Sequence, residues 1–153
     1  MAGLALSALF LVLGMGYGGY VYATEVPDGY SRISFNEMKP DELQERGGLI
    51  VPPDISSLEG KKIFIKGYIR PDSISVPHGI KGFLLVRDNN QCCFGDMSKI
   101  KYYDQILVAM TGGESVDYSQ GVFRIGGVLH IEPQYAVPGA PRPVFSLKAD
   151  YAN

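Results

Sequence analysis

The sequence predicts an all-β fold, a small five-stranded Greek-key barrel of the OB type that is preceded by an N-terminal apolar helix. Several segments alternate between apolar and polar residues with a period of two, which is typical of strands with one buried face. The composition favours turns over long helices, with 19 Gly and 10 Pro in 153 residues. Long first and fourth strands that contain glycine favour a barrel, and a β-sandwich fragment is the main alternative.

The five expected strands cover residues 62–70, 82–87, 105–110, 122–132 and 144–151. In the first strand the alternation places Ile63, Ile65 and Ile69 on one face. In the fourth and fifth strands we expect two sets of residues to point into the core, namely Phe123, Ile125, Leu129 and Ile131, and Phe145, Leu147, Ala149 and Tyr151.

Glycines interrupt two of these strands, at Gly67 in the first and at Gly126 and Gly127 in the fourth. Glycine weakens a strand unless it serves a bulge, a sharp bend or a close approach of another backbone. We therefore expect these glycines to lie at bends of a small barrel.

The first 23 residues contain no Asp, Glu, Lys, Arg or His. A helix needs about 20 apolar residues to cross a bilayer, so residues 1–23 are long enough to span one. Gly14 and Gly18 have the small-xxx-small spacing of a contact between membrane helices. The alternative is a secretory signal that is cleaved near Ala23. Either interpretation places the rest of the chain outside the cytoplasm, in the periplasm.

Residues 24–57 are expected to form a linker with a short helix. Ser34 and Glu37 have the spacing of a capping box. Pro40 then limits the first helical turn, and a helix over residues 41–46 would end at Gly47 and Gly48. The barrel domain is expected to cover residues 58–153.

The net charge argues against binding of nucleic acid, and the cysteine content excludes long-range disulfide bonds. The net charge is −2, so no global field draws the chain to nucleic acid. The two cysteines, Cys92 and Cys93, are adjacent, so they cannot link distant parts of the chain. The fold must therefore depend on its hydrophobic core.

Several short motifs resemble those of a bacterial family of exported domains of unknown function, in particular its planctomycete branch. The motifs are Leu58-Glu59-Gly60-Lys61-Lys62, Gly67-Tyr68-Ile69-Arg70-Pro71, Phe83-Leu84-Leu85-Val86-Arg87-Asp88 and Cys92-Cys93-Phe94-Gly95, followed by Gly126-Gly127 and Leu147-Lys148-Ala149-Asp150-Tyr151. The resemblance covers roughly residues 52–151. It implies an exported OB-like domain and assigns no catalytic residue. Other branches have a Cys followed soon by a His and a proline run at the position of Cys92, so a ligand set shared by the whole family is not implied.

Four residues could bind zinc or copper, namely Cys92, Cys93, His78 and His130. Thiolates and imidazoles are the ligands that these metals prefer. Their spacing matches no CxxC or HxxxH motif, however. A structural role for the two cysteines, buried or as a vicinal disulfide, is the majority expectation.

The outer face of the first strand alternates cations and aromatic rings, with Phe64, Lys66, Tyr68 and Arg70 as a candidate binding face. OB folds bind single-stranded nucleic acid with this combination. The export segment argues against nucleic acid, and we expect the N-terminal segment to cover part of the face. A peptide strand, a glycan or an anionic headgroup is the better match.

No catalytic motif is present, because the sequence contains no G-x-S-x-G elbow, phosphate-binding loop or HExxH. The sequence therefore predicts a non-catalytic binding or accessory module of the bacterial envelope. Two alternatives are an envelope metal-binding or thiol-redox protein that uses Cys92 and Cys93, and a single-helix subunit of a membrane complex.

Overall fold

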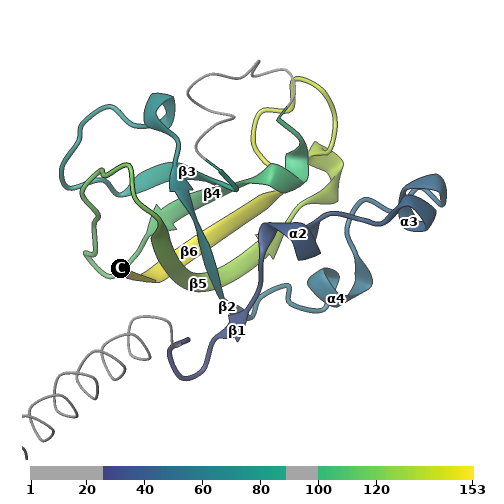
Figure 1. Ribbon diagram of the computed structural model, residues 1–153, viewed down its shortest axis with the longest axis horizontal. Helices are drawn as coiled ribbons and strands as arrows, with labels where there is room; N and C mark the ends of the chain where they lie inside the picture. The colour runs from purple at the N-terminus through teal and green to yellow at the C-terminus, as the bar shows by residue number, and fades with distance from the viewer. Residues whose placement is uncertain (1–25, 89–99) are drawn as a thin grey trace, which may run out of the picture.

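The computed structural model describes residues 26–88 and 100–153, and its body is a closed five-stranded β-barrel (Figure 1). The barrel strands are β2 (Lys62–Ile69), β3 (Gly82–Val86), β4 (Gln105–Met110), β5 (Phe123–Ile131) and β6 (Phe145–Ala152). The predicted five strands are confirmed, with ends that differ by about one residue. The predicted apolar helix of residues 1–23 lies outside the described residues. In the part that is described, no helix is long and apolar enough to span a membrane.

The strands follow the order β2-β3-β4-β6-β5, and β5 pairs back with β2 to close the barrel. The β4–β6 pair is parallel, and the other barrel pairs are antiparallel. A two-residue strand, β1 (Ser31–Arg32), adds to the outside of β2 in parallel. The barrel therefore brings β2 and β5 together on one side and β3 and β4 together on another.

The core follows the alternation that the sequence predicts. On β2, Ile63 and Ile65 are fully buried. On β4, Ile106 and Val108 are fully buried, whereas Leu107 between them is 37% exposed. The expected inward residues of β5 also contribute: Phe123, Ile125 and Leu129 are buried, and Ile131 is partly buried against the same core.

A β-bulge interrupts the β5–β6 pair between Gly126 and Gly127, so the expectation of glycine at a bend is confirmed there. A Cβ atom at Gly127 would lie 2.2 Å from the carbonyl oxygen of Lys148, so only glycine permits this approach of the two backbones. The bulge also changes which way β6 faces. The register moves from Gly127 opposite Ala149 to Gly126 opposite Tyr151.

The prediction that Tyr151 points into the core is wrong for that reason. Its ring packs on the outer side of the barrel, 6.0 Å from the ring of Phe64 and 6.3 Å from that of Tyr30. Asp150, the residue between the two registers, reaches out to Tyr30 and Lys62. A strict alternation cannot be continued through a bulge, which inserts one residue without a partner.

The N-terminal segment contains three short helices, α2 (Phe35–Met38), α3 (Glu42–Arg46) and α4 (Pro53–Ser56). The predicted caps are present: Ser34 and Glu37 form a capping box, and α3 begins after Asp41 and ends at Gly47. The segment is more than a linker, because it buries five side chains in the barrel core: Ile33, Phe35, Met38, Val51 and Ile55.

Candidate binding groove

A groove of about 990 Å³ crosses the outer face of β3 and β4, and we refer to it as the β3–β4 groove. Leu84 and Leu107 lie directly opposite each other on the two strands and form part of its floor. Its walls come from the connection after β2 with Arg70 and Ser73, from residues 100–102, and from the loop between β5 and β6. Three separate connections therefore border one face of the sheet.

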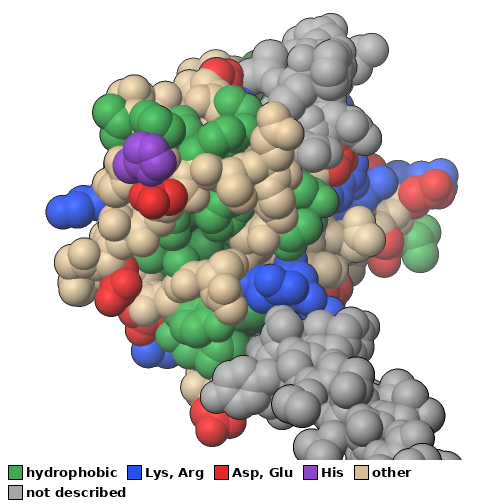
Figure 2. Space-filling view, turned by 60° about the vertical axis from the view of Figure 1, so that its left-hand side comes forward, with side chains coloured by type: hydrophobic (Ala, Val, Ile, Leu, Met, Phe, Trp, Pro, Cys, Tyr) green, Lys and Arg blue, Asp and Glu red, His purple; other side chains and the backbone are tan. Residues whose placement is uncertain are grey.

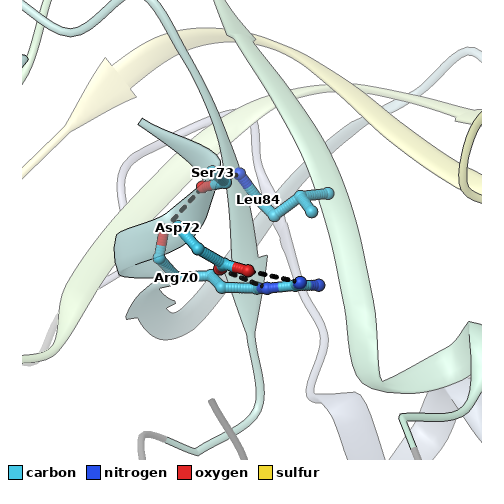
Figure 3. A network of polar contacts seen from close by, with 4 residues as sticks. All are labelled: Arg70, Asp72, Ser73 and Leu84. Atoms are coloured by element: carbon cyan, nitrogen blue, oxygen red, sulfur yellow. Dashed lines mark hydrogen bonds and ion pairs between the residues drawn. The ribbon is translucent and has the colours of Figure 1, made fainter. Parts of the chain in front are cut away.

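The wall after β2 is held by a compact polar network (Figure 3). The guanidinium of Arg70 donates two hydrogen bonds to Asp72, from Nε to Oδ1 at 2.6 Å and from Nη2 to Oδ2 at 2.7 Å. The hydroxyl of Ser73 donates to the carbonyl of Arg70 at 2.6 Å and accepts from the amide of Leu84 at 3.0 Å. Two strands and the 3₁₀ turn η1 (Pro71–Ser73) are thus joined at one point, and the Arg70 side chain is fixed in orientation.

The opposite wall is the loop between β5 and β6, which includes the 3₁₀ turn η4 (Pro133–Tyr135). The amide of Glu132 donates to the carbonyl of Val144 at 2.8 Å, so the two ends of the loop are closed on each other. The guanidinium of Arg142 lies 5.2 Å from the centroid of the Tyr135 ring, and its Nη1 is 3.5 Å from Glu132 Oε2. Four prolines lie between residues 133 and 143, which restricts the backbone of this wall.

The third wall is the 3₁₀ turn η3 (Tyr102–Asp104), which leads into β4. The hydroxyl of Tyr102 donates to the carbonyl of Ile50 at 2.7 Å, which joins this turn to the N-terminal segment. Burial raises the pKa of the Tyr102 hydroxyl above its ordinary value. The buried carboxylate of Asp104 forms an ion pair with Arg87 at 3.4 Å, which anchors the end of the turn.

The charges along the groove are positive. Arg70, Lys101 and Arg142 line it, and no Asp or Glu of the described residues does. Asp72 and Glu132 lie behind Arg70 and Arg142 and offset part of their charge. Since the floor is apolar and the rim carries tyrosines and cations, the groove suits an extended ligand with flat or apolar faces and negative groups.

The predicted binding face on β2 is divided by the structure. Phe64 is 1% exposed, because Tyr151 packs against it and β1 pairs alongside it. This agrees with the expectation that the N-terminal segment covers part of the face. Lys66 and Tyr68 remain partly exposed on the β2 side, whereas Arg70 lies in the β3–β4 groove.

The two histidines of the predicted metal site each lie beside a carboxylate from another segment. His78 Nδ1 is 3.4 Å from Asp117 Oδ2, and His130 Nδ1 is 3.2 Å from Glu59 Oε1. Between residues 26 and 88 and from 100 onward, no three His, Cys, Asp or Glu side chains form a group that could hold a metal ion. Cys92 and Cys93 lie outside the described residues, as do Gly14 and Gly18, so a zinc or copper site and a helix contact stay predictions.

The barrel is similar in fold to a solved crystal structure described as a DUF3299 family protein from Pseudomonas aeruginosa PAO1. The TM-score is 0.54 at 16% sequence identity, and the match covers 81% of this chain and 95% of that chain. At this identity the likeness shows the fold alone. It is consistent with the resemblance to a domain family that has no defined function. No protein-family model and no curated protein matches the sequence.

Sequence reasoning did not find the groove, although one signal for it was present. The loop of residues 132–144 combines four prolines with Tyr135, Val137 and Arg142. A loop of this length with aromatic and cationic residues is more often functional than a short polar turn. Its position opposite Leu84 and Leu107 depends on barrel closure, which no local pattern encodes.

Proposed function

We propose that this protein is a non-catalytic binding module of the OB type, and that the β3–β4 groove is its ligand site. The observation that carries the proposal is the position of the groove. OB barrels bind oligonucleotides and oligosaccharides on their second and third strands, between the loop after the first strand and the loop before the last. Counted around this barrel, β3 and β4 are the second and third strands, and the two loops provide Arg70 and Arg142.

The chemistry of the groove supports an acidic glycan or an acidic peptide strand as the ligand. Leu107 and Val137 are exposed by 37% and 58% and would cover the apolar face of a sugar ring or side chain. Arg142 lies over the ring of Tyr135 and would face a carboxylate or sulfate of the ligand. A binding role needs no reaction centre, and we infer that the protein acts as an accessory to a larger envelope assembly.

The test uses the full-length chain with three named probes, polygalacturonate, polyglutamate and oligothymidylate. We expect binding of one of the first two, and a loss of affinity of about tenfold or more for Leu107→Asp, because the new carboxylate repels the ligand and removes an apolar contact. Leu43→Asp is the matched control, since Leu43 is 77% exposed on α3 and does not line the groove. Equal loss in both variants, binding of oligothymidylate alone, or turnover of a glycan or peptide would contradict the proposal.

We further infer that the module is held in the cell envelope, and that it belongs to the planctomycete-type branch with the Cys-Cys-Phe-Gly motif. The uncharged residues 1–23 support the location, either as an anchor or as a signal that is cleaved near Ala23. The intact mass of the native protein distinguishes the two, because cleavage removes the whole segment. Recovery of the unprocessed chain from the cytosolic fraction would contradict an envelope location.

A further inference from the structure

Three cationic side chains lie together on the opposite side of the barrel from the groove. Arg32 comes from β1, Lys66 from β2 and Arg124 from β5. Lys66 and Arg124 are direct partners in the β2–β5 register, and Arg32 lies opposite Phe64, two positions from Lys66. We refer to these three residues as the β2–β5 cation cluster. Figure 2 shows Lys and Arg side chains gathered in the lower central part of the face turned toward the viewer.

The cluster has no acidic partner among residues 26–88 and 100–153. Other cations on β2 and directly after it do: Lys62 pairs with Asp150, and Arg70 with Asp72. In addition, Nε of Arg124 is buried without a hydrogen-bond partner in the described part of the chain. Like charges directly opposite each other across two strands destabilise a sheet, and an unpaired buried donor adds to that cost.

Electrostatics agree with this arrangement. Burial lowers the pKa of Lys66, and the charges of Arg124 and Arg32 lower it further. Lys66 is therefore close enough to both arginines to be affected by their charges. An uncompensated cluster of this kind is typical of a site whose missing charge is supplied by a ligand.

We propose that Arg32, Lys66 and Arg124 bind a phosphate group. Guanidinium groups fit oxyanions in a forked geometry, and an ammonium adds a compact charge. Inorganic phosphate presents four oxygens and up to two charges, so one ion can contact three cations at once, whereas a carboxylate presents two oxygens. The phosphodiester of a lipid headgroup carries one charge on two unesterified oxygens, so neighbouring headgroups together would match the three cations. The phosphate could be free in solution or part of an anionic lipid headgroup. The lipid source is consistent with the sequence, in which Arg32 follows the uncharged segment 1–23 by nine residues.

The experiment measures the melting temperature of the full chain in neutral detergent micelles. One arm replaces chloride with inorganic phosphate at equal ionic strength, and the other adds phosphatidylglycerol or, as its reference, phosphatidylcholine to the micelles. Binding to the folded state raises Tm, and we expect a rise of roughly 3 °C or more in at least one arm. A rise with phosphate identifies a free-phosphate site, and a rise with phosphatidylglycerol alone identifies a headgroup site.

The variant Lys66→Gln/Arg124→Gln should lose the rise, and Lys66→Arg should keep it. The control Lys81→Gln/Lys148→Gln removes the same charge from two exposed lysines elsewhere and should also keep the rise. Because the double variant relieves repulsion, its own Tm without ligand should equal or exceed that of the wild type. No rise in either arm, or a rise that survives Lys66→Gln/Arg124→Gln, would overturn the proposal. Neither result depends on the β3–β4 groove.

Discussion

The two sides of the barrel differ in what covers them. On the β2–β5 side, the chain's own N-terminal segment lies over the strands, with β1 beside β2 and the ring of Tyr30 over Gly126. On the β3–β4 side, the sheet carries Leu107 at 37% exposure, and the described parts of three connections border a groove over the strands. Figure 1 shows β1 beside β2 at the start of that strand.

The difference shows how one small barrel separates a covered apolar surface, which stabilises the fold, from an open apolar surface, which is available to a ligand. Aromatic rings on the outer surface of a barrel need cover, and the covered side supplies it from within the chain. The open side keeps apolar side chains at the surface, where a ligand can provide the missing contact. Substitutions of apolar residues at equivalent outer positions should therefore affect stability on the β2–β5 side and ligand binding on the β3–β4 side.

The largest expected difference is between Phe64→Ala and Leu107→Ala. Phe64 is 1% exposed although it lies on the outer side of β2, so its truncation should cost about 3–5 kcal/mol of unfolding free energy. Leu107→Ala removes an exposed side chain and should cost about 1 kcal/mol or less, while it weakens ligand binding. Urea denaturation monitored by circular dichroism gives both values. Similar losses in the two variants would show that the sides are not distinct.

The sequence predicts the strands of the barrel but not what covers each side of it, because that cover depends on contacts between distant parts of the chain. Alternation is a local signal, so the strands and the buried face of β4 follow from it directly, and the spacing of Ser34 and Glu37 predicts the capping box of α2. The burial of Phe35 and Met38 does not follow from a local signal, because their partners lie in the barrel, far along the chain. The cover on β2 and the groove on β3 both result from non-local packing.

The same distinction explains the candidate site. Arg70 is one of the predicted face residues, yet it belongs to the groove because β2 ends there and the chain turns toward β3. Arg142 and Tyr135 lie outside any strand or helix pattern. Their place beside the groove depends on the loop of residues 132–144, whose two ends are hydrogen-bonded to each other. The orientation of Tyr151 depends on the β-bulge at Gly126 and Gly127. The two glycines make a bulge possible, but the sequence does not show at which residue of β6 it occurs.

An intermediate effect is expected at Gly126, where the cover meets the sheet. A Cβ atom there would lie 2.7 Å from Cε1 of Tyr30, so Gly126→Ala must displace the ring. We expect a loss of about 1–3 kcal/mol, as for other overpacked sites. Gly121→Ala is the control, since its Cβ would meet only the Ser119 hydroxyl at 3.4 Å. In the double variant Gly126→Ala/Tyr30→Ala the added cost of Gly126→Ala should largely disappear, and its persistence would show that the clash lies elsewhere.

The smallest expected effect is the pH dependence of the contact that holds Tyr30 in place. The Tyr30 hydroxyl donates to Asp150 Oδ1 at 2.6 Å, and the Lys62 ammonium donates to Asp150 Oδ2 at 2.5 Å. The hydrogen bond from Lys62, and after it that from Tyr30, lowers the pKa of Asp150 in the folded protein. An unfolded Asp has a pKa of about 3.9, so the unfolded state takes up its proton first as the pH falls.

The contribution of Asp150 is therefore complete above the unfolded pKa and is lost as the pH falls from about 4 through the lower folded pKa. The Asp150 side chain is 38% exposed, so solvent screening should limit the effect to about 0.5 kcal/mol. The free energies of unfolding from urea denaturation at pH 6 and pH 3 should differ by about 0.5 kcal/mol more in the wild type than in Asp150→Asn. Added salt should reduce the difference, because the pair is near the surface. An equal pH dependence in both proteins would mean that ring packing alone, and not the Asp150 contact, keeps the β2–β5 side covered.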